Sequence, residues 1–167
     1  MILDGLLQFS GTAGTNVASG TGTDSPTTGA QFSNNVIDLG VGRDLGIGDD
    51  PAIKVTVACV TTFTGGTSLQ ISVQGSTDNS TFTTMASGPV IVEANLIAGT
   101  HLCDIDLPRI AGALPDRPGA SQALPRYLRL GYTSVGTHGA GALYAYLNLD
   151  RHDQIAYPSG FTWPVGV

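Results

Sequence analysis

The sequence predicts an all-β protein: an antiparallel jelly-roll sandwich of about eight strands, with an extended N-terminal segment and a C-terminal tail. Two observations predict this fold. Apolar and polar residues alternate in most segments after residue 35, and no segment keeps a helical period for more than two turns. Since the polar residues of each strand fall on one side, each sheet has one wet face and packs by its other face. A closed barrel is the alternative architecture.

The N-terminal region, residues 1–35, is expected to hold one strand near residues 5–9 and then a long arm. Residues 10–35 are rich in Gly, Thr, Ser and Ala and show no period. This composition favours neither a helix nor a core strand, so we expect an arm or loop that lies against another surface.

The jelly-roll domain is expected at residues 36–150, and period two identifies its strands. In most of these strands, every second residue is apolar and is expected to face the core. The clearest strands are AIKVTVACV (52–60), SLQISVQGS (68–76), STFTTMA (80–86), HLCDIDL (101–107), RYLRLGY (126–132) and ALYAYLNLD (142–150), with weaker ones at 36–39 and 89–93.

Two proline-containing segments are predicted to lie outside the sheets. The loop at residues 108–125 contains four prolines, which prevent a sheet ladder, and a loop of this length usually contacts something or crosses between sheets. The tail, residues 151–167, carries Tyr157, Phe161 and Trp163. We expect these aromatic residues to bind a partner; the alternative is that the tail covers its own domain.

Charge and hydropathy exclude several classes of function. Only 12% of the residues are charged, and one lysine and six arginines face thirteen acidic residues, for a net charge of -6. So few cations cannot form the basic patch that nucleic-acid binding needs. The apolar runs are far shorter than the ~20 residues that cross a bilayer, so we expect no membrane partner. The N-terminus does not resemble a secretion signal.

The candidates for catalysis or metal binding are few. His101, Asp104 and Asp106 form an H-x-x-D-x-D pattern, but on a regular strand His101 faces away from the two acids, so the three are not expected to converge. Calcium between Asp104 and Asp106 remains an alternative. His138, in GTHGAG, is expected at a hairpin tip or strand start. We therefore expect no catalytic, cofactor-binding or metal-binding residue, and no enzyme.

The cysteines have no zinc-site spacing. Cys59 and Cys103 each continue an apolar stripe, which predicts two buried free thiols.

An aromatic stripe predicts self-association. Tyr127 and Arg129 are expected to face outward on one strand, and Tyr144 and Tyr146 on an adjacent strand. An exposed tyrosine and arginine strip is typical of protein interfaces, so we expect a homodimer through a sheet face or edge.

Two segments carry a resemblance to a known family. They are LQISVQGSTDNSTFTTM (69–85) and RYLRLGYTSVGTHGAGALYAYLNLD (126–150). Together with the start MILDGLLQFSG, they resemble the cement, or decoration, proteins of short-tailed phage capsids of the Bordetella-phage type. The resemblance implies a dimeric jelly roll, made in the host cytoplasm, that binds the outer surface of an icosahedral head built from a major capsid protein. It implies a structural protein of the virion that holds neighbouring capsomers together and needs no cofactor.

A second resemblance implies another class of function. The hairpin QGSTDNSTF is also similar to one in discoidin-like carbohydrate-binding jelly rolls. In that case Tyr127, Tyr144 and Tyr146, with Arg129, would supply a stacking platform for a sugar.

Overall fold

The computed structural model describes residues 7–11, 22–40, 53–107 and 125–149. Within these residues the protein is all-β, and every strand pairing is antiparallel. The described part of the chain has no helix with the length and apolar content that crossing a membrane requires. The elements are β1 (Thr28–Phe32), β2 (Ile37–Asp38), β3 (Ile53–Ser76), β4 (Thr83–Val92), the short 3-10 helix η3 (Glu93–Asn95), β5 (His101–Asp106) and β6 (Tyr127–Leu149).

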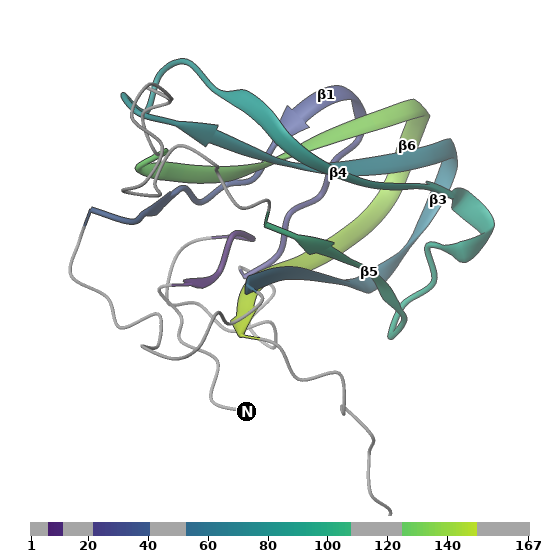
Figure 1. Cartoon of the computed structure of the whole chain (residues 1–167). Helices are drawn as coiled ribbons and strands as arrows, with labels where there is room; N and C mark the ends of the chain where they lie inside the picture. Colours follow the sequence, from purple (N-terminus) through teal and green to yellow (C-terminus); the bar gives the residue numbers. More distant parts are fainter. Residues whose placement is uncertain (1–6, 12–21, 41–52, 108–124, 150–167) are drawn as a thin grey trace, which may run out of the picture.

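Two long strands organise the sheet. β3 and β6 pair along their whole length, from Ile53 opposite Leu149 to Ser76 opposite Tyr127, and they bend together near their middle (Figure 1). The bend folds the single sheet into two layers. We call the layer with residues 68–76 and 127–135 the upper layer, as drawn in Figure 1; β4 pairs with its β3 side, and β1 and β2 with its β6 side. The lower layer contains residues 53–59 and 142–149, and β5.

Glycines form the bend, where the β3–β6 register shifts several times between Cys59 and Ser68. Gly136, opposite Gly66, has φ +80°, and a Cβ there would lie 3.2 Å from the Gly66 backbone. Gly141 has φ +141°, and a Cβ there would overlap the ring of Phe63. A side chain at either position therefore conflicts with the bend, because L-residues rarely adopt positive φ and the opposing atoms leave no room.

The core lies between the two layers and follows the predicted alternation. Its largest group of fully buried apolar side chains comes from both halves of the long strands: Val55, Val57, Leu69, Ile71, Val73, Leu130, Leu143 and Ala145. Each large apolar side chain stabilises the fold by about 1.5–3 kcal/mol when it leaves water. Cys59 and Cys103 are buried free thiols, as predicted, and burial raises the pKa of Cys103 to about 11.

A buried carboxyl group attaches the N-terminal segments to this core. Asp24 is 2% exposed; its Oδ2 accepts a 2.6 Å hydrogen bond from the Tyr132 hydroxyl, and its Oδ1 accepts from the backbone N–H groups of Gly11 and Asn34. Its own backbone exchanges two hydrogen bonds with Leu143 of β6. Asp24 thus joins the backbone at positions 11 and 34, as well as its own segment, to β6.

The strand predictions need three corrections. Six strands are described instead of about eight. The described residues of the segments predicted at 52–60 and 68–76 belong to one strand, β3, and those of the segments predicted at 126–132 and 142–150 to β6 or its start. The Gly-rich stretches between them bend the strands and do not reverse the chain. The predicted strands at 80–86 and 89–93 likewise merge into β4. The jelly-roll connectivity remains a prediction.

The third correction concerns β1, which lies inside the predicted arm at residues 10–35. β1 pairs through its backbone as an edge strand, and its side chains are mostly exposed. It therefore needs no apolar alternation, which is the only signal that the sequence could have offered.

Substitution of Gly136 tests the bend. We expect Gly136→Ala to lower the free energy of unfolding by about 1–2 kcal/mol, because alanine adopts positive φ at that cost. Gly139→Ala is the matched control: a Cβ there would meet no atom closer than 3.9 Å, and Gly139 does not have a positive φ. Urea denaturation measures both variants. Equal stabilities would show that the bend does not depend on the backbone conformation of Gly136.

The buried Asp24 carboxyl predicts a specific pH dependence. Burial raises the pKa of Asp24 in the folded protein, despite hydrogen bonds that lower it. The folded state therefore binds the proton more tightly, so the contribution of Asp24 to stability is present below about pH 4 and is lost as the pH rises through the folded pKa. We therefore expect the difference in free energy of unfolding, parent protein minus Asp24→Asn, to decrease as the pH rises from about 4 to about 7. Urea denaturation at each pH measures this difference.

Asp78→Asn is the control for this experiment. Hydrogen bonds from the backbone of Thr81 and Ser80 hold the pKa of Asp78 well below its ordinary value, so Asp78 is ionised in both states above about pH 5. The difference in free energy of unfolding between the parent protein and Asp78→Asn should stay constant over the same pH range. A flat difference for Asp24→Asn as well would contradict the buried-carboxyl interpretation.

Candidate functional site

The two layers present outer faces of different chemistry. In the upper layer, the segments 28–32, 68–76, 83–92 and 127–135 contain one charged residue, Arg129, and the short β2 adds Asp38, which is paired with Arg126. The lower layer carries Lys54, His101, Asp104 and Asp106 on β3 and β5. We therefore consider the upper outer face and the lower outer face separately.

The upper outer face is centred on Arg129. Its guanidinium carbon lies 3.6 Å from the ring centroid of Phe32 and 3.9 Å from that of Phe82, so an aromatic ring lies on either side of it. Its Nε donates a 2.9 Å hydrogen bond to Oε1 of Gln74 on β3. Residues from β1, β3, β6 and the end of the turn before β4 thus hold one arginine in place.

Other exposed apolar side chains lie on the same outer face, four to six residues further along the strands from Arg129. Val90 and Val92 on β4 are 61% and 51% exposed, and Val135 on β6 is 53% exposed. Val92 and Val135 pair with the same residue of β3, Ser68, so they lie on one row across the sheet. Phe32 is 48% exposed at the β1 edge. The face combines apolar side chains with uncharged polar ones, which is typical of a surface that another protein covers.

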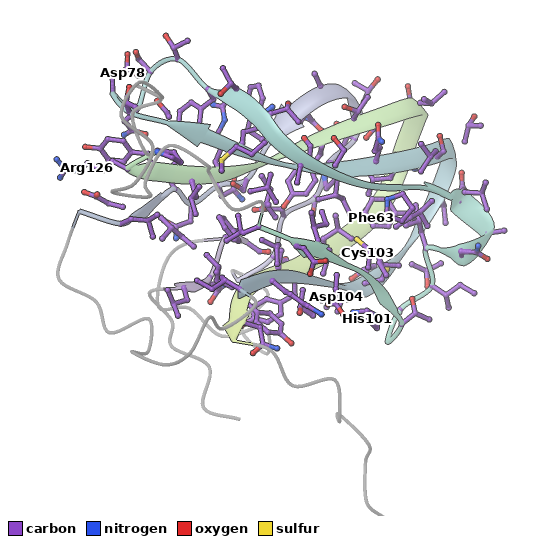
Figure 2. The ribbon with its side chains drawn as sticks, in the orientation of Figure 1. Phe63, Asp78, His101, Cys103, Asp104 and Arg126 are labelled. Carbon is purple, nitrogen blue, oxygen red and sulfur yellow. The ribbon has the colours of Figure 1, made fainter. Side chains whose placement is uncertain are left out.

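The lower outer face corrects the prediction for His101. His101 is predicted to face away from Asp104, yet its Nε2 lies 3.0 Å from Asp104 Oδ1, and Figure 2 shows the two side chains close together beside β5. The cause is a bulge: Cys103 lies opposite Val57 but His101 lies opposite Ala58, so β5 has one extra residue there. The bulge moves His101 to the face of the two acids.

The Asp104 carboxylate is held by several partners. Its Oδ1 also accepts a 2.8 Å hydrogen bond from the Thr56 hydroxyl. Burial raises the pKa of Asp104, but these hydrogen bonds and the charges of His101 and Lys54 lower it by more. Asp106 lies 3.7 Å from the Lys54 ammonium. Within the described ranges, no three His, Cys, Asp or Glu side chains form a group that could hold a metal ion.

The predicted aromatic stripe is divided between the two faces. Tyr127 and Arg129 belong to the upper half of β6, and Tyr144 and Tyr146 to its lower half, so the four residues lie on one bent strand and not on two adjacent strands. The rings of Tyr144 and Tyr146 are 5.3 Å apart, but Tyr146 is only 8% exposed. The four side chains therefore cannot form one continuous platform for a partner or a sugar.

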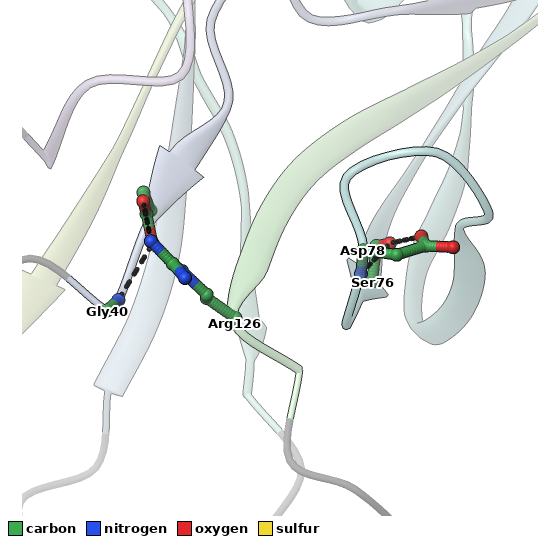
Figure 3. Close-up of polar contacts among 5 residues, drawn as sticks. Gly40, Ser76, Asp78 and Arg126 are labelled. Atoms are coloured by element: carbon green, nitrogen blue, oxygen red, sulfur yellow. Dashed lines mark hydrogen bonds and ion pairs between the residues drawn. The ribbon is translucent and has the colours of Figure 1, made fainter.

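An ion pair fixes one end of the upper layer. Arg126 donates from Nε and Nη2 to the two oxygens of Asp38, at 2.8 and 2.9 Å, and the N–H of Gly40 also donates to Asp38 (Figure 3). The Leu39 N–H donates to the backbone oxygen of Arg126 at 2.7 Å. The residues that flank segments 41–52 and 108–124 are thus held side by side.

His138 lies inside β6 and not at a hairpin tip as predicted. Its ring is 2% exposed, packs edge-on against Phe63 at 5.1 Å and occupies the space beside Gly66. Neither ring nitrogen has a hydrogen-bond partner among the described residues. The ring of His138 therefore fills the space inside the bend, next to Gly66 and Phe63.

Other predicted site residues lie outside the described residues. These are the tail residues Tyr157, Phe161 and Trp163, and almost all of the Pro-rich loop. The sequence alone did not indicate that Phe32, Phe82 and the exposed valines belong to the upper outer face. Phe82 does alternate with polar neighbours, but its contact with Arg129 depends on the strand order, which a single sequence does not contain.

The comparisons with known proteins identify the family. The family model Bbp16 matches residues 23–147, which is most of the chain. The name suggests a family of Bordetella phage proteins, as the resemblance implied, and states no function. A search of curated proteins finds no match. Because the family model matches well over half of the chain, including both layers of the sheet, the chain belongs to the Bbp16 family.

Proposed function

We propose that this protein is a capsid cement, or decoration, protein. It binds the outer surface of an icosahedral phage head and stabilises the contacts between capsomers. Membership of a family with a phage-derived name supports a structural role in the virion. The observation that carries the proposal is the upper outer face, where Phe32, Val90, Val92 and Val135 are exposed on strand segments that contain one charge.

The physical basis of cementing is contact area repeated over a lattice. A face of apolar and uncharged polar groups loses little hydration when it is covered, and it gains from apolar burial and hydrogen bonds. Each contact can be weak, because a protein bound at many equivalent sites stabilises the whole shell. This function needs no catalytic residue and no cofactor. The proposal includes the jelly-roll connectivity, which is supported by the two layers of the bent sheet around one core.

The second partner in the proposal is another copy of the chain. β1 is the edge of the sheet order β1-β6-β3-β4, and its residues TGAQF are uncharged and mostly exposed. An uncharged edge strand is a template for pairing with a second strand. Dimerisation through β1 extends the sheet and leaves the upper outer face free for the major capsid protein.

Binding to heads tests the main proposal. We expect the chain to co-sediment with phage heads assembled without it, up to a fixed ratio to the capsid protein, and to raise the temperature at which the heads rupture. Val92→Asp should weaken this binding, because it places a charge on the upper outer face. Ile97→Asp is the matched control, because Ile97 is 49% exposed, close to the 51% of Val92, but lies outside the upper-layer strands. Failure of the parent protein to sediment with heads would reject the cement function.

Light scattering tests the dimer. We expect twice the chain mass of 17.1 kDa. Because the Ser33 N–H bonds to Leu130, the alternation of the antiparallel ladder points the Ala30 N–H away from β6. Ala30→Pro therefore removes a donor from the free edge and should give monomers that keep the far-UV circular dichroism spectrum of the parent protein. A parent protein of 17.1 kDa at all concentrations, or a dimer that survives Ala30→Pro, would contradict pairing through β1.

A further inference from the structure

Arg129 is the only charged residue in β1, β4 and the upper halves of β3 and β6. The short β2 of the same layer adds Asp38, which is paired with Arg126. A charge that becomes buried in an interface without a partner is strongly unfavourable. If the upper outer face is covered, as the proposed function requires, Arg129 must be neutralised or must find an opposite charge. Its burial already lowers the pKa of the guanidinium, and no acidic side chain is recorded as its partner among the described residues.

The guanidinium of Arg129 is positioned before any partner binds. Phe32 and Phe82 lie on either side of it at 3.6 and 3.9 Å, and Gln74 accepts from its Nε. The side chain therefore has little rotamer freedom left to lose on binding. Tyr127 and the exposed Val135 lie at outward positions of the same half of β6.

The terminal amino groups of Arg129 remain available. Among the described residues, neither Nη1 nor Nη2 has a recorded hydrogen-bond acceptor. Arg126 provides the contrast within the same chain: its Nε and Nη2 already bind both oxygens of Asp38. Arg126 is satisfied internally, whereas Arg129 is a fixed cation whose outer donors lack a described partner.

We propose that Arg129 is the docking point for a carboxylate of the major capsid protein, an Asp or Glu side chain on an otherwise apolar surface. Carboxylate oxygens match the planar arrangement of guanidinium donors. The exposed ring of Phe32, which packs against Arg129, then excludes water from one side of the ion pair. This inference rests on the proposed cement function and adds the chemistry of the partner group.

The first experiment measures binding of Arg129→Gln to phage heads assembled without the chain. We expect at least a tenfold loss of affinity, because the partner carboxylate loses its charged donor. Arg126→Gln is the matched control and should bind like the parent protein, since its ion pair lies within the chain. Parent-like binding by Arg129→Gln would overturn the docking inference but not the cement function. No binding by the parent protein would overturn both.

The second experiment identifies the partner group. It keeps a positive charge at position 129, so its result does not depend on whether Arg129→Gln is stable. Lys54 is the only lysine, so Lys54→Arg combined with Arg129→Lys places the only lysine ammonium at the proposed docking point. With the variant bound to heads, a carbodiimide should join this ammonium to a contacting carboxylate as an amide. Mass spectrometry of the product locates both residues.

The outcome of cross-linking is decisive in each direction. A cross-link from position 129 to an Asp or Glu of the capsid protein supports the inference. A cross-link to a second copy of this chain, or no cross-link at position 129 on heads that retain the variant, would overturn it. The Lys54→Arg variant alone is the control and should give no product at position 129, because arginine does not form the amide.

Discussion

The antiparallel ladder between β3 and β6 runs from Ile53 to Ser76, and every other described strand pairs with one of these two. Because the two strands bend together, both halves of each strand face a single core. The bend therefore determines which residues point into the core and which form the two outer faces. It is possible only where glycine relieves the backbone, as at Gly136, and where the rings of Phe63 and His138 occupy the space that side chains at Gly141 and Gly66 would need.

The same bend separates two chemical surfaces. Charged groups gather on the lower outer face around Asp104, where they satisfy one another. The upper outer face keeps its apolar side chains exposed and holds Arg129 between Phe32 and Phe82. The exposed valines and the fixed arginine add nothing to the stability of the fold itself. A partner that covers this face explains why they are exposed. This asymmetry connects the fold to the proposed cement function.

Much of the fold could be predicted from the sequence, because buried strands leave a periodic signal. The inward residues of β3 and β6, such as Val57 and Leu130, and the burial of both cysteines are confirmed. Features that rest on the backbone were not predictable in the same way. β1 pairs without burying its side chains, and the bulge in β5 reverses the direction of His101 with no mark in the local pattern. A glycine-rich stretch between two predicted strands does not show whether the chain bends or reverses there, since a bend within a strand and a chain reversal use the same residues.

The candidate site was predicted only in part, because its residues come together through strand order. Arg129 was named as an interface residue, but its aromatic partners lie 97 and 47 positions earlier in the chain, at Phe32 and Phe82. Tyr144 and Tyr146 were grouped with it because the bend in β6 was not foreseen. Asp24 went unnoticed for a related reason: it lies in a stretch without periodicity, and its role depends on distant segments that meet it only in the folded chain.

Electron cryomicroscopy of phage heads, with and without this chain, tests the cement function most directly. The proposal predicts extra density on the outer surface, over the contacts between capsomers. A two-layered sheet should fit this density with its upper outer face against the shell and the Arg129 side chain at an acidic residue. Identical maps for the two kinds of head, or density only inside the shell, would contradict it.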